Sequence, residues 1–258
     1  MRWVLLAAAA LSLSSLSGSQ PLRQNIAAPA PLGAEAVAKA AVPVVVELFT
    51  SEGCSSCPPA DQLLSKLLNE QPVAGVRIIP LGMHVTYWDQ LGWKDPASLK
   101  GATERQQEYG RRFGEDRVYT PQAVIDGRAE LVGSDEAGVK RAIAKAAREP
   151  HLAMQLSASI KPDGIYATVT VDNVPMHGQE PTRDVLIVSE DGLTSMVKRG
   201  ENGGRTLRHD AVVRRIAIGK QILGQVPEHW RRDRLQLTAL LQGEKTGRIY
   251  AAATVPLR

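Results

Sequence analysis

The sequence has little of several features that would indicate a function directly. Its 258 residues include two cysteines and 4% aromatic side chains, so a small fold held by several disulfides is excluded. Lys and Arg number 31 and Asp and Glu 27, without a long basic block, so no nucleic-acid partner is indicated. The apolar run from Trp3 to Leu13 is shorter than the ~20 residues that span a bilayer.

The N-terminus instead has the layout of an export signal. Arg2 precedes the apolar run, and small residues follow it, which predicts a signal peptide over residues 1–19. Residues 20–43 are rich in Ala and Pro and lack a hydrophobic period, so we expect a linker there. The sequence therefore predicts a periplasmic or secreted protein without stable membrane insertion after signal cleavage.

Both cysteines lie in VVVELFTSEGCSSCPPAD, residues 44–61, as Cys54 and Cys57. A structural disulfide across so short a loop contributes about 2 kcal/mol, against about 4.7 kcal/mol for a loop of ~100 residues. Structural zinc requires further ligands, but there is no second cysteine pair and no H-x(3–5)-H spacing among the five histidines. We therefore favour a redox-active dithiol over these two alternatives.

The context of the cysteines supports this interpretation. Val44–Phe49 is a nearly continuous apolar strand, and Pro58–Pro59 begins a predicted helix with an apolar face. Residues 76–81 form a second apolar strand. The cysteines are thus expected where a strand ends and a helix begins, and the free N–H groups and dipole of a helix N-terminus stabilise a thiolate.

Pro58 affects the roles of the two cysteines. A proline disfavours the α conformation in the residue before it, so we expect Cys57 to be the N-cap and Pro58 the first helical residue. Cys54 is farther from the helix and is expected to be more exposed. We therefore predict that Cys54 attacks and Cys57 resolves the mixed disulfide.

The rest of the chain divides near Pro150. A helix is predicted over residues 97–113, strands over 122–126 and 129–132, and a last helix capped by Ser134. The pattern then changes to period two, which predicts a separate antiparallel β domain over residues 151–258. Its candidate strands are LAMQLSASI, GIYATVTVD, RDVLIVSED, RLQLTALLQ and GRIYAAATV.

The order βαβαββα resembles the thioredoxin superfamily. The segments ELFTSEGCSSCPPAD, HVTYWDQLGWKDP, YTPQAVIDG and RGENGGRTLRHDAVVR together resemble a secreted bacterial family known as domain of unknown function 1223. The resemblance implies an α/β fold with a thioredoxin-like domain and mixed sheet over residues 44–150. It also implies a cis proline at Pro121 that faces the dithiol and aligns the substrate backbone. The family supplies a fold and a compartment but no reaction.

Other residues are expected near the dithiol. His84 ends the second strand, so we expect its imidazole to assist proton transfer at the cysteines. Two thiolates and one imidazole also suit Cu(I), so a copper site of Cys54, Cys57 and His84 is an alternative. Trp88 and Trp93, with Thr120, either form a groove for a polypeptide substrate or anchor a long loop.

One charged run stands out in the second half. Residues 197–215 contain six Lys or Arg against Glu201 and Asp210. This Gly-rich segment, with Arg199, Arg205 and Arg208, is expected either to bind an anion or an acidic partner, or to be a hairpin loop that docks on the first domain.

The sequence thus favours a thiol:disulfide oxidoreductase that uses no cofactor and acts on envelope proteins with thiols or disulfides. Because the chain has only two cysteines, its electrons must be exchanged with an external redox partner. The alternative is a non-catalytic thioredoxin-like interaction module with an inert disulfide. The direction of the redox chemistry stays open.

Overall fold

The computed structural model describes residues 41–115, 117–172, 180–219 and 223–258. These residues belong to one compact unit, Lys39–Arg258. The predicted signal peptide and nearly all of the predicted linker lie outside the described residues. Val42 and Pro43, which were expected in the linker, are already part of the first strand, β1 (Val42–Thr50).

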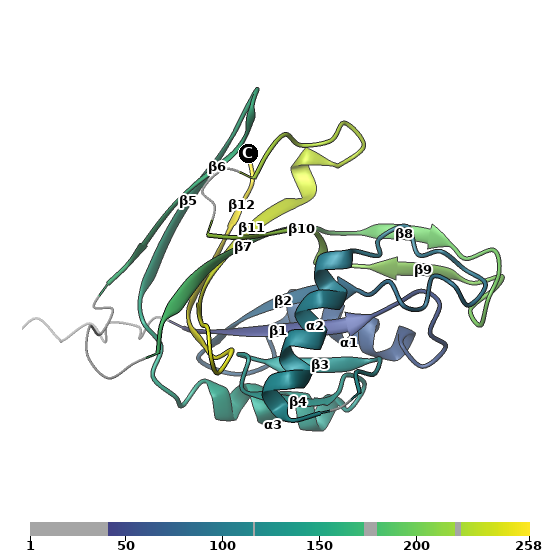
Figure 1. Ribbon diagram of the computed structural model, residues 1–258, viewed down its shortest axis with the longest axis horizontal. Helices are drawn as coiled ribbons and strands as arrows, with labels where there is room; N and C mark the ends of the chain where they lie inside the picture. The colour runs from purple at the N-terminus through teal and green to yellow at the C-terminus, as the bar shows by residue number, and fades with distance from the viewer. Residues whose placement is uncertain (1–40, 116, 173–179, 220–222) are drawn as a thin grey trace, which may run out of the picture. The chain divides into compact units, whose positions relative to one another are not determined.

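A mixed sheet of eight strands organises the chain, in the order β12-β11-β7-β10-β2-β1-β3-β4 (Figure 1). β1 is parallel to β2 and antiparallel to β3, and β4 is antiparallel to β3. The elements up to residue 150, besides β1, are α1 (Pro58–Glu70), β2 (Val76–His84), α2 (Lys100–Phe113), β3 (Gln122–Ile125), β4 (Ala129–Val132) and α3 (Glu136–Ala146).

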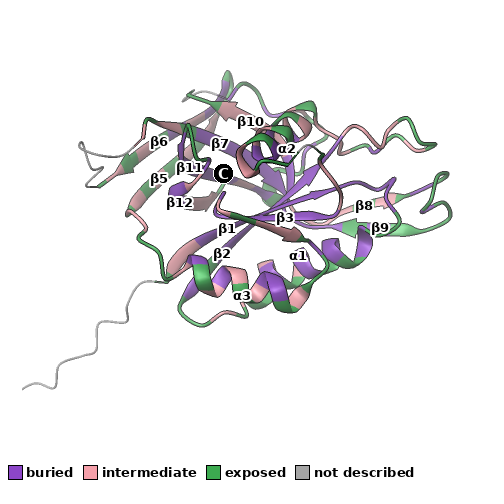
Figure 2. Cartoon of the chain, turned by 60° about the horizontal axis from the view of Figure 1, so that its bottom comes forward, coloured by how far each residue is buried: buried purple, intermediate pink, exposed green. Residues whose placement is uncertain are grey.

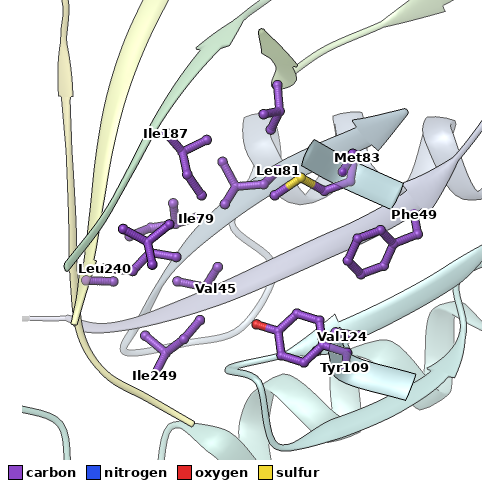
Figure 3. Close-up of a cluster of buried hydrophobic side chains, with 14 of the residues drawn as sticks. Val45, Phe49, Ile79, Leu81, Met83, Tyr109, Val124, Ile187, Leu240 and Ile249 are labelled. Atoms are coloured by element: carbon purple, nitrogen blue, oxygen red, sulfur yellow. The ribbon is translucent and has the colours of Figure 1, made fainter. Parts of the chain in front are cut away.

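β1 is the centre of the core because both of its faces are buried. Val44, Val46 and Leu48 pack against residues of α1 and α3, the two helices that lie along that face of the sheet in Figure 2. Val45 and Phe49 point to the opposite face and pack around Tyr109 of α2 (Figure 3). Alternate side chains of a strand point to opposite faces, so a continuous apolar run is what a strand between two layers of helices requires.

The three helices are 13, 14 and 11 residues long. Among the described residues, no helix combines the length and the apolar character needed to cross a membrane. α3 is capped by Asp135, whose carboxylate accepts the Gly138 N–H at 2.9 Å, so the prediction of Ser134 as the cap is wrong by one residue. Both residue types favour the N-cap position, and the pattern alone did not separate them.

The second half supplies more strands than the sequence predicted. All five predicted strands are present, and three further strands, β8, β9 and β10, occupy the charged run and its flanks. The bounds are β5 (Met154–Lys161), β6 (Gly164–Val171), β7 (Thr182–Glu190), β8 (Leu193–Met196), β9 (Thr206–His209), β10 (Val212–Ile218), a short 3-10 helix (Arg232–Arg234), β11 (Leu235–Gly243) and β12 (Ile249–Pro256).

The expected separate β domain is not confirmed, because most of the second half continues the first sheet. β10 pairs with β2 at Val212 and Gly82 and with β7 on its other side, and β11 and β12 follow. No local pattern predicted this join, since Arg214 and Arg215 interrupt the apolar pattern of β10 and a register shift follows Val213. The hairpin β5–β6 is the exception: it forms its own two-stranded sheet.

A buried polar network connects the two halves. The guanidinium of Arg105 on α2 donates to both carboxylate oxygens of Glu47 on β1, at 2.5 and 3.0 Å. Another Arg105 nitrogen donates to Gln242 Oε1 on β11 at 3.0 Å, and the Gln242 amide donates to the Tyr109 hydroxyl at 2.9 Å. Buried charges require such partners, so β11 is bound to this position by more than apolar packing.

Candidate functional site

Cys54 and Cys57 form a disulfide in the loop between β1 and α1, with Cα atoms 5.4 Å apart. As predicted, Cys57 is the N-cap of α1 and a proline occupies the first helical position. The prediction that Pro58 keeps Cys57 out of the α region is wrong, since the φ and ψ of Cys57 are −79° and −37°. The Cys57 carbonyl accepts the N–H groups of Ala60 and Asp61 at 2.9 and 3.1 Å, and these bonds outweigh the local preference.

Both cysteines are buried. Cys54 is 1% exposed and Cys57 is 0% exposed, so the expectation that Cys54 is the more accessible sulfur is not met. The two residues between them, Ser55 and Ser56, are exposed, and the Ser56 hydroxyl lies 3.4 Å from the Cys54 sulfur. The two serines of the motif are thus exposed to solvent, whereas its two cysteines are buried.

A loop from the second half covers the disulfide. We call residues 197–205, which join β8 to β9, the covering loop. Asn202 is fully buried, and its amide nitrogen donates to the carbonyl oxygens of Glu52 and Cys54, both at 2.9 Å. Glu201 accepts the Ser55 N–H at 2.9 Å. The covering loop therefore binds the backbone on both sides of Cys54, which agrees with the predicted docking hairpin.

Glycine permits the close approach of this loop to the segment after β2. A Cβ atom at Gly200, where φ is +79°, would lie 3.3 Å from the Cβ of Trp93. The predicted arginines take different places: Arg205 donates to Asn202 Oδ1 at 2.8 Å, whereas Arg199 and Arg208 extend into solvent. Gly200 and Asn202 thus fit the loop to its neighbours, while its cations remain on the outside.

A buried ion pair lies beside the cysteine segment. His84 Nδ1 is 2.7 Å from Asp95 Oδ2, and the same oxygen accepts the Glu52 N–H at 2.9 Å. Burial lowers the pKa of His84, but the charge and hydrogen bond of Asp95, with smaller contributions from Asp61 and Glu52, raise it to about 9. Burial raises the pKa of Asp95, but the charge and hydrogen bond of His84 outweigh burial and lower the pKa of Asp95 to about 2. At neutral pH this is an imidazolium and a carboxylate.

His209 of β9 extends this cluster, although no sequence pattern predicted a role for it. Its Nε2 lies 3.3 Å from Glu52 Oε1, and its Nδ1 lies 3.6 Å from Asp61 Oδ2. Its ring meets that of His84 edge to face, with centroids 4.8 Å apart. The alternation in RTLRHD places Leu207 and His209 on one face of a strand, and this was the signal that a period-two search could have used.

Asp61 is the member of the cluster that follows the disulfide in sequence. It lies on α1 four residues after Cys57, and side chains four residues apart share one face of a helix. Burial raises the pKa of its carboxyl. Asp61 Oδ2 has no hydrogen-bond partner, and neither does either ring nitrogen of His209. Because an unsatisfied buried polar group costs about 1–3 kcal/mol, Asp61 and His209 are candidates for a functional role.

The predicted groove residues are held by hydrogen bonds within the chain. The Trp88 indole donates to Thr120 Oγ1 at 2.8 Å, and the Trp93 indole donates to Glu52 Oε2 at 2.7 Å. The Thr120–Pro121 peptide bond is cis, as the resemblance implies. A Cβ atom at Gly53 would lie 3.2 Å from the Trp88 Cβ, so Trp88 links the cysteine loop to Thr120. Both indoles are half-buried, and a substrate groove formed by them stays a prediction.

The copper alternative gains no support from the arrangement of the described side chains. The two sulfurs are bonded to each other, and His84 Nδ1 is engaged with Asp95. Within the part of the chain that the structure describes, no group of three or more His, Cys, Asp or Glu has an arrangement that could hold a metal ion. We therefore consider the site as a disulfide with surrounding acids and histidines.

The fold and the site define a mixed α/β protein with a buried disulfide between its first strand and first helix. The chain belongs to the family described as Protein of unknown function (DUF1223), whose model matches residues 45–248. A crystal structure of protein AGR_C_4864 from Agrobacterium tumefaciens is similar, with a TM-score of 0.62 and 29% identity, over 83% of this chain and 94% of that chain.

A second similar structure is HBP35 of Porphyromonas gingivalis, with a TM-score of 0.63 and 15% identity. The match covers 84% of this chain and 76% of that chain, and at this identity it concerns the fold alone. A search of curated proteins found no match to the sequence.

Proposed function

We propose that the chain is a thiol:disulfide oxidoreductase whose Cys54–Cys57 pair exchanges electrons with the cysteines of other proteins. The observation that carries this proposal is a disulfide at a strand-to-helix junction whose flanking residues Glu52 and Asp61 belong to a buried cluster of acids and histidines. The parallel β1-α1-β2 unit, the antiparallel β3 and β4, and the cis Pro121 support a thioredoxin-like arrangement of this half.

The exchange proceeds in two balanced steps. A thiolate of the partner attacks Cys54 Sγ, a partner–Cys54 bond forms, and the Cys54–Cys57 bond breaks, so Cys57 leaves as a thiolate and takes up a proton. A second partner thiolate then attacks the partner's own sulfur in the mixed disulfide and releases Cys54. Two electrons and two protons move from the partner to the pair, and the reverse sequence oxidises a partner.

The surrounding groups suit this chemistry. A thiolate at the buried Cys57 is costly in a low dielectric, and in this proposal Asp61, whose pKa is raised by burial, supplies its proton. His84 is held as an imidazolium by Asp95, and in this proposal it stabilises the thiolate by charge instead of accepting a proton. Pro121 aligns the substrate backbone in this proposal, as the resemblance implies.

The covering loop must move before a protein thiol can react. An attacking sulfur must approach a disulfide sulfur closely, and here both cysteines are buried while Asn202 binds the Cys54 carbonyl. We therefore propose a closed resting state and a reactive state in which the covering loop is displaced. The setting is an oxidising compartment outside the cytoplasm, with an external redox partner.

Substitution of single cysteines tests the proposal. Cys57→Ser is expected to accumulate mixed disulfides with envelope proteins through Cys54, since no resolving thiol remains, whereas Cys54→Ser is not. Non-reducing gels followed by mass spectrometry of the trapped adducts measure this directly. A double Cys54→Ser, Cys57→Ser variant is the control, and the absence of adducts in both single variants contradicts the assigned roles.

The second candidate function is a non-catalytic interaction module with an inert disulfide. The complete burial of both sulfurs is the observation that favours it. Equilibration with glutathione buffers separates the two functions: a potential below about −300 mV with unreactive thiols indicates the inert module, and a higher potential indicates a catalytic pair.

A further inference from the structure

The β8–β9 hairpin has two unlike faces. Pairing of Thr194 with Arg208 and of Met196 with Thr206 places these four exposed residues on one side. The opposite side carries Leu207 and His209, which are both buried. His209 is the residue of the cluster that lies near Glu52 and Asp61. Because side chains alternate across a strand, the outer side of the hairpin is free for contacts while the inner side completes the site.

The outer side and the adjoining loops are strongly basic. Lys198, Arg199, Arg205 and Arg208 are exposed on or beside the covering loop. Lys94 is exposed next to Trp93, which contacts Gly200 of that loop. Two carboxylates lie among them: Glu201 accepts the Ser55 N–H, which lowers the pKa of Glu201, and the largely buried Asp210 has its Oδ1 3.9 Å from the Arg208 guanidinium. Five cations therefore gather here in a chain whose formal net charge is only +4.

Two apolar side chains lie among these cations. Met196 on the outer face is 66% exposed, and Leu91 is 62% exposed. The Leu91 carbonyl oxygen would be 3.7 Å from a Cβ atom at Gly200, so the two loops are in contact here. Exposed apolar residues within a charged rim are typical of a surface for another protein.

We propose that this basic face, made of Lys94, Lys198, Arg199, Arg205 and Arg208 with Leu91 and Met196, binds an acidic polypeptide segment next to the reactive cysteine of the redox partner. The proposal rests on the proposed function, and it names the partner chemistry for the same site. Opposite charge accelerates encounter and aligns the partner, and the contact is with the very loop that covers the disulfide. Docking thereby delivers the partner's sulfur to the place where Cys54 becomes accessible.

Matched peptides separate recognition from chemistry. Two peptides share one cysteine-containing core, and one carries Asp flanks while the other carries Lys flanks; serine versions of both report binding by fluorescence anisotropy. The full chain is expected to bind the acidic serine peptide at least about tenfold tighter than the basic one at low ionic strength, and salt near 0.2 M should reduce the difference. Equal binding of the two peptides overturns the proposal.

Charge reversal locates the surface. Lys198→Glu with Arg199→Glu is expected to abolish or reverse the preference for the acidic peptide. Arg141→Glu with Arg148→Glu is the matched control, since these exposed cations lie on or just after α3, away from the hairpin (Figure 1). A preference that survives the first pair, or falls equally in the control, places recognition elsewhere and overturns the proposal.

The cysteine versions of the peptides test the underlying function separately. Their second-order rates with the disulfide are compared per thiolate, because charged flanks shift the thiol pKa. Faster reduction by the acidic peptide supports both proposals. Selective binding of the acidic peptide with no reduction by either peptide contradicts the oxidoreductase and leaves the docking surface standing.

Discussion

Asn202→Ala is expected to increase the rate at which dithiothreitol reduces the Cys54–Cys57 disulfide by at least about tenfold. The variant loses the donor that serves two buried backbone carbonyls; the Cys54 carbonyl keeps the Cys57 N–H at 3.2 Å, whereas the Glu52 carbonyl loses the donor found for it among the described residues. A buried carbonyl left unpaired costs about 1–3 kcal/mol in the closed state. In the open state water can hydrate those carbonyls, so the equilibrium shifts toward opening. A shift of about 1.4 kcal/mol corresponds to a factor of ten when opening precedes reaction.

The rate is measured by quenching samples with an alkylating reagent and counting labelled cysteines by mass spectrometry. Asn69→Ala is the matched control, because Asn69 is exposed on α1 and bonds only within its own helix. Glu201→Gln, which weakens the contact with the Ser55 N–H, is expected to show a smaller increase. Circular dichroism establishes that each variant is folded, and an unchanged rate in folded Asn202→Ala rules out the covering loop as the barrier.

The second large effect is on stability. The part of the unfolding free energy that depends on His84 is expected to fall by about 3 kcal/mol between pH 6.5 and pH 9. The folded pKa of about 9 lies above the unfolded value of about 6.5, so this stabilisation is complete below 6.5 and is lost as pH rises through 9. The depressed pKa of Asp95 acts at the other end: its contribution is complete above about 3.9 and is lost as pH falls toward 2.

Urea unfolding of the wild type and of His84→Gln across this range isolates the effect as a difference between two curves. The difference is expected to be largest between about pH 4 and 6.5 and to shrink by pH 9. His229→Gln is the control, because His229 is exposed and lies outside the cluster of Glu52, Asp61 and His209 that faces His84. Curves that stay parallel for wild type and His84→Gln contradict a charged, buried His84.

Local patterns predicted much of the first half of the molecule. The apolar run before the cysteines became a strand buried on both faces, and Cys57 became the helix N-cap with Pro58 after it. The five period-two strands of the second half also formed. These features follow from side-chain periodicity and proline geometry, which act over a few residues and are therefore visible in sequence.

The sequence also predicted that the two cysteines lie at the strand-to-helix junction and that His84 ends its strand. For the Gly-rich run, a docking hairpin was one of its two predictions. Tertiary structure alone decided that β10 joins the two halves, that Asn202 binds the Cys54 carbonyl from 148 residues away, and that His209 meets Asp61 on α1. One side-chain amide that binds two distant carbonyls leaves no periodic signal. Burial of both sulfurs is therefore a consequence of sheet order, which depends on long-range pairing that no local pattern encodes.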